Sequence, residues 1–99
     1  MDEFRIILQQ SWSNHLSLHE LAAITQVHPD LILRFQEFGL IDPIGAEGGE
    51  PLYDLAVIQK VRTIRRLRAE MGVNLAGVAV ILELLDKIKQ LQAEIEWLR

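Results

Sequence analysis

Apolar and polar positions alternate over the first ten residues of the chain. Phe4, Ile6 and Leu8 fall on one face of this alternation, which predicts a short N-terminal strand with one face buried. The next run, residues 10–16, is mostly polar and predicts a loop.

Two short helical patterns follow, separated by a turn of about three residues. Ser17 and Glu20 have the spacing of a capping box in front of apolar residues at helical intervals, so we predict a helix over about 18–25. Pro29 suits the first turn of a second helix, because its missing N–H would be unpaired there, and Gly39 ends that helix. Two helices joined by a tight turn indicate a helix-turn-helix unit.

Glycine and proline are frequent in residues 40–53 and break any regular helix there. Ile44 can pair with Leu52 and Tyr53 across a turn, so we predict a short β-hairpin, or wing. We interpret the Gly48-Gly49 pair as a turn rather than a phosphate cradle, because no glycine-rich loop leads from a strand into a helix with a lysine.

Two longer helices complete the pattern. We expect Asp54 to cap a third helix, which Gly72 ends, and Asn74 to cap a last helix over about 75–98. Isoleucine and leucine alternate along this last helix at intervals of three and four residues, which is the spacing of a heptad seam. The seam consists of Ile81, Leu84, Ile88, Leu91, Ile95 and Leu98.

The seam predicts an interface between two copies of the chain. Its alternation of isoleucine and leucine is preferred in parallel two-stranded coiled coils, but so short a seam does not decide the orientation. We expect the first half of the helix to pack on its own domain. The second half, with Ile88, Leu91, Ile95 and Leu98, is expected to project as a homodimer interface, and the alternative is a cap over the same chain. Trp97 lies outside the seam and either marks an interface or is a partly covered residue.

These elements predict a mainly α fold, a winged helix-turn-helix with a short N-terminal strand, a β-hairpin wing and a long C-terminal helix. We expect residues 1–74 to form the winged-helix domain and residues 75–99 to form the long helix. A length of 99 residues fits one small domain, whose small core would gain stability from a partner or from dimerisation.

The composition argues against several kinds of chemistry. The chain has no cysteine, which excludes disulfides, thiolate metal sites and thiol nucleophiles. His15 and His19 are four residues apart, but Ser17 caps the helix between them, so they share no helical face for a metal. We find no nucleophile with its base and expect no enzymatic activity, no metal and no cofactor. Without a secretion signal or an apolar stretch long enough to span a membrane, we expect a cytoplasmic protein.

Charge is unevenly distributed along the chain. Fourteen acidic and ten basic residues give a net charge of −4, which opposes strong contact with phosphate backbones. Residues 40–55 carry four acids and no base, whereas residues 56–72 carry five bases and one acid. We interpret the basic block from Arg62 to Arg68 as a solvated helix face attracted to the acidic wing and to the end of its own helix. A stripe that contacts phosphates is the alternative.

The chain resembles the winged-helix unit of the MerR superfamily from Leu16 to about Ile88. The landmarks are the Leu21-Ala22 pair, Val27 with Pro29 at the turn, Gly39-Leu40-Ile41, Tyr53 at the end of the wing, and Arg66-Leu67-Arg68 before Gly72. Within that superfamily it is most similar to the chaperone modulators of the CbpM family, above all in the segment GVAVILELLDKI. This resemblance implies that the protein binds and inhibits the J-domain of a CbpA-type, DnaJ-like co-chaperone.

A MerR-like, DNA-binding transcriptional regulator is the alternative function. Such regulators commonly place basic residues near the turn of the second helix and just before the tyrosine that closes the wing. Here these places hold Asp30, Leu33 and the Pro51-Leu52 pair. A carboxylate repels phosphates, so we expect a protein partner rather than DNA. An interaction adaptor outside the chaperone system is a third alternative.

Acidic side chains are the candidate partner-binding residues. J-domains of this family resemble one another in a basic second helix that they use to reach the Hsp70 chaperone. An acidic surface would steer the encounter and mask that helix, so we expect competition with Hsp70. Each acid taken alone could instead be an ordinary solvated charge. The candidates are Asp30, Glu37 and Asp42 around the second helix and wing, and Glu83 and Asp86 on the long helix.

Overall fold

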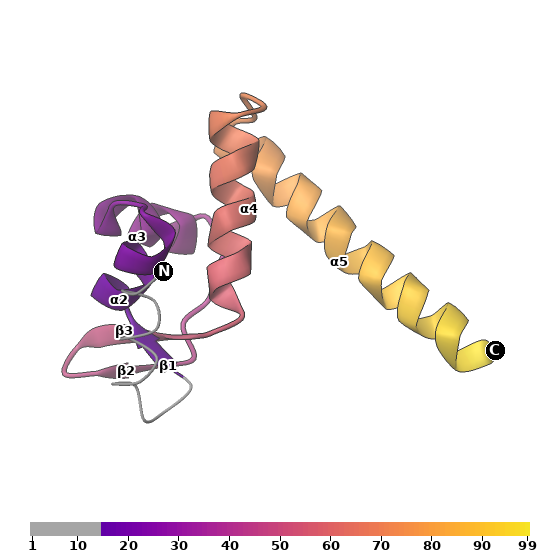
Figure 1. Cartoon of the computed structure of the whole chain (residues 1–99), viewed down its shortest axis with the longest axis horizontal. Helices are drawn as coiled ribbons and strands as arrows, with labels where there is room; N and C mark the ends of the chain where they lie inside the picture. The colour runs from indigo at the N-terminus through magenta and orange to yellow at the C-terminus, as the bar shows by residue number, and fades with distance from the viewer. Residues whose placement is uncertain (1–14) are drawn as a thin grey trace.

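A computed structural model of the chain describes residues 15–99 (Figure 1). The strand predicted over residues 4–8 lies outside the described residues. The fold is mainly helical, with a small sheet and a long C-terminal helix, as the sequence predicts. In chain order the elements are β1 (His15–Ser17), α2 (Leu18–Thr25), α3 (Pro29–Glu37), β2 (Gly45–Glu47), β3 (Glu50–Asp54), α4 (Val57–Ala69) and α5 (Leu75–Leu98).

The helix-turn-helix unit consists of α2 and α3, and its start has the predicted capping box. The Ser17 hydroxyl accepts a hydrogen bond of 3.1 Å from the Glu20 N–H, while a Glu20 carboxylate oxygen accepts one of 2.9 Å from the Ser17 N–H. Gln26 ends α2 in the left-handed conformation, with φ at 57°. Pro29 is the first residue of α3, where its missing N–H costs nothing.

The end of α3 turns sharply at Gly39, whose φ is 74°. The Leu40 N–H donates to the Phe35 carbonyl and the Gly39 N–H donates to the Gln36 carbonyl, each at 2.9 Å. This pair of bonds is a Schellman motif, which satisfies the last carbonyls of the helix and requires a residue that tolerates positive φ. Leu40 and Ile41 then enter the core.

The sheet has three antiparallel strands in the order β1-β3-β2. The wing is the predicted hairpin of β2 and β3, and both turn glycines, Gly48 and Gly49, have positive φ as a two-residue hairpin turn requires.

One strand prediction was wrong. His15 and Leu16 were predicted as part of the loop over residues 10–16 but belong to β1, because the backbone of this segment pairs with β3, a contact that so short a segment does not reveal. Across the wing, Ile44 donates its N–H to the Leu52 carbonyl at 2.8 Å, as the predicted pairing of these two residues requires. On the other side of β3, Tyr53 pairs with Leu16 of β1.

The two long helices begin differently. Asn74 caps α5 as predicted, because its side-chain oxygen accepts a hydrogen bond of 2.8 Å from the Gly77 N–H. Asp54 does not cap α4: the helix begins at Val57, and the N-cap position is Ala56, which makes no side-chain cap bond. The Asp54 carboxylate accepts a hydrogen bond of 2.8 Å from the Ala56 N–H and so forms a turn between β3 and the helix.

The core lies between α2, α3, α4 and the sheet, and α5 contributes only its first turns. Its largest fully buried side chains include Tyr53, Phe35, Leu16, Leu21 and Ile32. On α5 only Leu75 and Val78 are buried. The remainder of the helix projects from the domain (Figure 1). At 24 residues, α5 is about 36 Å long.

Candidate protein-interaction surfaces

A hollow of about 310 Å³ lies between α5, α4 and the segment that follows α3. Glu83 and Asp86 line it and, being three residues apart, lie on one face of α5. The backbone segment 39–40 also lines it, and Glu37 and Asp42 each lie two residues from that segment. We call this surface the acidic hollow. The fold brings two of the five predicted partner-binding residues, Glu83 and Asp86, to its lining, whereas Glu37 and Asp42 are near it only along the chain.

The carboxylates of the acidic hollow form no ion pair within the described residues. Within residues 15–99 the ion pairs join His28 to Asp30 and Glu96 to Arg99. Lys60 lines the hollow but forms no ion pair with its acids. The negative charge of this surface is thus available to a basic partner.

Asp30 lies apart from the other four acids. It occupies the first turn of α3, where its N–H donates to Nδ1 of His28 at 3.1 Å and its carboxylate lies 3.8 Å from the same nitrogen. Glu37 is at the other end of this helix, about 10 Å along its axis. Asp30 therefore does not share the hollow.

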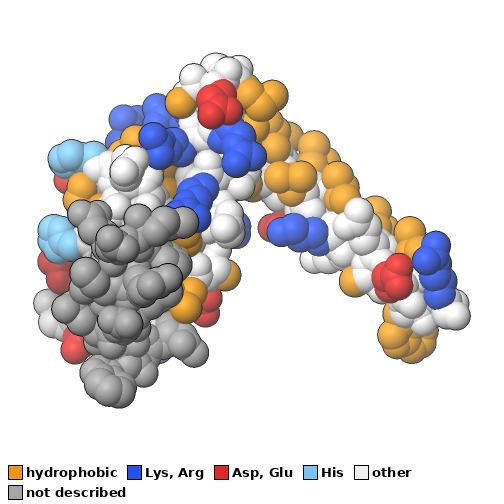
Figure 2. Space-filling model, viewed as in Figure 1, with side chains coloured by type: hydrophobic (Ala, Val, Ile, Leu, Met, Phe, Trp, Pro, Cys, Tyr) orange, Lys and Arg blue, Asp and Glu red, His pale blue; other side chains and the backbone are white. Residues whose placement is uncertain are grey.

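The heptad seam of α5 is exposed over most of its length. Leu84, Ile88, Leu91 and Ile95 are 48–57% exposed, and Leu98 is 76% exposed. Ile81 alone among the seam residues packs against the core. Figure 2 shows hydrophobic side chains along α5 beyond the domain. The described part of the chain therefore places no cover over the seam, and the alternative of a cap by the same domain finds no support there.

The positions at which relatives would read DNA are poorly suited to that task. Leu33 is half-buried and packs against the core. Pro51 and Leu52 are half-buried residues of β3. Asp30 presents an exposed carboxylate that would repel phosphates.

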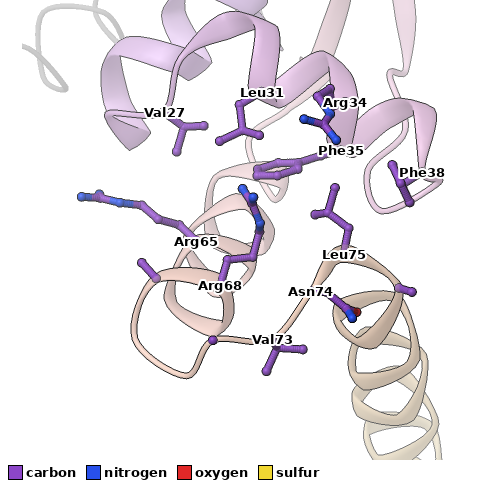
Figure 3. Close-up of a pocket in the computed structure, with 13 residues that line it drawn as sticks. Val27, Leu31, Arg34, Phe35, Phe38, Arg65, Arg68, Val73, Asn74 and Leu75 are labelled. Atoms are coloured by element: carbon purple, nitrogen blue, oxygen red, sulfur yellow. The ribbon is translucent and has the colours of Figure 1, made fainter.

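A second and larger concave surface lies at the corner where α3 meets α4 and the start of α5 (Figure 3). Its volume is about 680 Å³. We call it the arginine groove, because three arginines line it together with an apolar floor and rim. The arginines are Arg34, Arg65 and Arg68, and the apolar residues include Val27, Leu31, Phe35, Phe38, Val73 and Leu75.

The three arginines of the groove are held differently. The guanidinium carbon of Arg68 lies 5.9 Å from the centre of the Phe35 ring, within the range of a cation–π contact. Arg65 donates a hydrogen bond of 3.2 Å to the Thr25 carbonyl. Arg34 is exposed in the last turn of α3. None of the three forms an ion pair within the described residues.

The basic block on α4 fits its sequence interpretation in part. Arg66 and Arg68 lie in the last turn of α4, where positive charge complements the helix dipole. No ion pair joins this block to the wing acids within residues 15–99. The attraction to the wing therefore does not take the form of direct pairing.

Two kinds of feature are absent from residues 15–99. No group of three or more histidine or acidic side chains is placed to hold a metal ion. No helix in this range combines the length and the apolar character needed to cross a membrane.

Comparison with known proteins places the chain among bacterial regulators and modulators. Residues 16–99 match the family described as MerR HTH family regulatory protein. The chaperone modulatory protein CbpM of Pseudomonas putida is 30% identical over 84 residues, which cover 85% of this chain and 83% of that protein. The chain belongs to the CbpM family of MerR-like proteins.

Other relatives agree with this placement. CbpM of Coxiella burnetii is 26% identical over 93 residues, covering 94% of this chain and 86% of that protein. A putative heat shock protein HspR of Streptomyces coelicolor is 31% identical over 72 residues, which span 73% of this chain but 48% of HspR. The resemblance to the CbpM family seen in the sequence is confirmed.

The arginine groove of this CbpM-family chain was missed by the sequence analysis. Arg34 and Arg68 are far apart along the chain, and only the packing of α3 on α4 brings them to one groove. Two spacings in the sequence are consistent with this groove. Arg65 and Arg68, like Phe35 and Phe38, are three residues apart and so share a helix face.

Proposed function

We propose that this protein modulates a CbpA-type, DnaJ-like co-chaperone: it binds the J-domain and inhibits it by competing with Hsp70. Membership of the CbpM family supports this proposal, because the Coxiella and Pseudomonas relatives are named chaperone modulatory proteins. The acidic hollow is the single structural observation that carries it.

The acidic hollow suits a basic helix, which is the feature that the family resemblance implies for the J-domain. Glu83 and Asp86 on α5 line the same hollow, and Glu37 and Asp42 are each two residues along the chain from its Gly39 and Leu40 lining. Unpaired carboxylates around one depression raise the local concentration of a basic partner and speed its association. Because these side chains are exposed, their contribution falls as salt rises.

The protein acts as a homodimer in this proposal. The exposed residues Ile88, Leu91, Ile95 and Leu98 form a continuous apolar strip on α5. A partner helix with the same seam would cover it by knobs-into-holes packing. Each dimer would then present two acidic hollows.

Calorimetric titration of the whole protein into the isolated J-domain of a CbpA-type co-chaperone tests the proposed function. We expect saturable binding that weakens with salt. The double variant Glu83→Lys and Asp86→Lys should bind at least about tenfold more weakly, because both carboxylates face the hollow. The matched control is Glu47→Lys with Glu50→Lys, the same charge change on the wing, where these two residues pair across β2 and β3.

Two further titrations separate the alternatives. Hsp70 added to the mixture should lower the apparent affinity for the J-domain if the two compete. Duplex DNA at the same salt should give no binding. Salt-sensitive DNA binding without J-domain binding would reject the proposal in favour of a DNA-binding regulator, and equal losses in both double variants would remove the acidic hollow as the contact.

A further inference from the structure

We propose that the arginine groove is a second docking surface, which takes an amphipathic helix of a partner protein carrying carboxylates beside its apolar face. The groove lies where α3 meets α4 and the first turn of α5, and Glu83 and Asp86 of the acidic hollow do not line it. The inference does not rest on the J-domain proposal.

The apolar part of the groove supplies the anchoring contacts. Leu31, on α3, is half-buried, and Figure 3 shows it directed toward the α4–α5 corner. Phe38, seven residues later, lies at the rim and is half exposed. Val73 is half-buried on the opposite side, and the fully buried Phe35 ring closes the floor. Apolar side chains at intervals of three and four residues on a docked helix would meet such a surface in the helix-in-groove mode.

The charged part of the groove sets the sign of the partner. Arg34, Arg65 and Arg68 line it, and no acidic residue does. The guanidinium of Arg68 lies over the Phe35 ring and forms no ion pair within the described residues, so its N–H groups can pair with a carboxylate. Arginine pairs with carboxylates through two parallel hydrogen bonds, so the groove favours aspartate and glutamate over neutral side chains.

The openness of the groove and its mixed lining select a protein helix over other occupants. A small ligand needs a cavity that buries most of its surface, whereas this groove is open at the Phe38 rim. Duplex DNA offers phosphates but no apolar face for Leu31 and Phe38.

Fluorescence anisotropy with a designed peptide tests this surface on the whole protein. The probe is a labelled helix of about 16 residues with leucine on one face and glutamate beside it, and a second probe carries lysine in place of glutamate. We expect saturable binding of the glutamate peptide and at least tenfold weaker binding of the lysine peptide. Arg34→Glu and Arg68→Glu should each weaken the glutamate peptide about tenfold.

The matched control is Arg66→Glu, which changes the same charge on the same helix without lining the groove. Its peptide affinity should stay within about twofold of the parent. Circular dichroism and thermal unfolding like those of the parent show that Arg34→Glu and Arg68→Glu fold. Equal losses in all three arginine variants would overturn the groove as the site. Groove variants that dissociate the dimer while the peptide fails to bind would assign the groove to a second copy and reject the partner helix. Binding of duplex DNA that Arg34→Glu and Arg68→Glu abolish, with no peptide binding, would reject it as well.

Discussion

The hydroxyl of Tyr53 donates a hydrogen bond of 2.6 Å to the side-chain carbonyl oxygen of Gln36, which joins the end of the wing to α3. The same tyrosine is fully buried, and its backbone pairs with Leu16 of β1. Tyr53 thus joins the wing to the first strand through its backbone and to the second helix of the helix-turn-helix unit through its side chain.

Replacement of Tyr53 by phenylalanine removes this hydrogen bond and leaves the ring in place. We expect Tyr53→Phe to lower the free energy of unfolding by about 1 kcal/mol, because Gln36 is then left without its partner in a half-buried site. Urea denaturation at neutral pH measures this change. Adding Gln36→Ala to Tyr53→Phe should lower the free energy of unfolding only a little further, because the hydrogen bond is already gone. If Gln36→Ala costs as much in this background as in the parent protein, the two residues act independently.

The stability of the protein should fall at alkaline pH because of the same residue. Burial, with a further contribution from Glu50, raises the pKa of Tyr53 above its usual value of 10.0. A raised pKa in the folded state means that the stabilisation is complete below about pH 10 and is lost as the pH rises through the folded pKa. Tyr53 is the only tyrosine in the chain, so ultraviolet absorbance of the tyrosinate follows its titration directly. Tyr53→Phe should lack this alkaline loss, and a parent titration near pH 10 would contradict the burial effect.

Gln26 adopts the left-handed conformation at the turn between α2 and α3. Glycine takes this conformation without steric cost, so Gln26→Gly should raise the free energy of unfolding by as much as about 1 kcal/mol. The control is Ala23→Gly, an exposed position within α2 where glycine should cost about 1 kcal/mol. Thermal unfolding of both variants gives the comparison, and a destabilised Gln26→Gly protein would show that its side chain matters more than its backbone.

Gly77 lies close to the loop that precedes α5. A Cβ at this position would lie 2.8 Å from a Val73 methyl carbon and 3.3 Å from the cap oxygen of Asn74. We expect Gly77→Ala to destabilise the protein by about 1–2 kcal/mol through this overlap. The double variant with Val73→Ala should lose less free energy of unfolding than the two single variants together, because Val73→Ala removes the overlapping methyl group. Denaturant melts of the two single variants and the double variant measure the coupling, and simple additivity would show that Val73 is not the obstacle.

The proposed dimer depends on the exposed seam of α5. A charge at its centre, Ile88→Asp or Leu91→Asp, should convert the protein to a monomer, because a buried carboxylate at a paired seam is strongly unfavourable. Gln90→Asp is the control, since Gln90 lies between the seam positions on another face of the helix. Sedimentation equilibrium measures the mass of each variant. A parent protein that is monomeric at high concentration would contradict the dimer.

Local patterns predicted the helical elements well. The capping box at Ser17, the proline at the start of α3 and the asparagine cap of α5 each form within a few residues, so their physics is contained in the sequence around them. The seam of α5 was predicted for the same reason. Its exposure agrees with a helix that contacts its own domain only near Leu75 and Val78.

Features made by distant residues were not predictable in this way. β1 exists because His15–Ser17 pairs with a strand more than thirty residues later, and three paired residues leave no alternation to detect. The arginine groove requires the packing of α3 on α4, which no spacing along one helix specifies. Five acids were predicted as candidate contacts, but which of them line a common hollow depends on how α5 packs beside α4 and the segment after α3, and only Glu83 and Asp86 do so.

In the proposed dimer, the length of the projecting part of α5 depends on the protein concentration. Residues 83–98 are exposed in the single chain, and a helix of that length is only marginally stable alone in water. Pairing of two such arms would supply the missing contacts, so helix formation there and association become one equilibrium. Dilution would then melt the arm from its tip while the core stays folded. The folded part of the projecting helix would thus be longer at higher protein concentration.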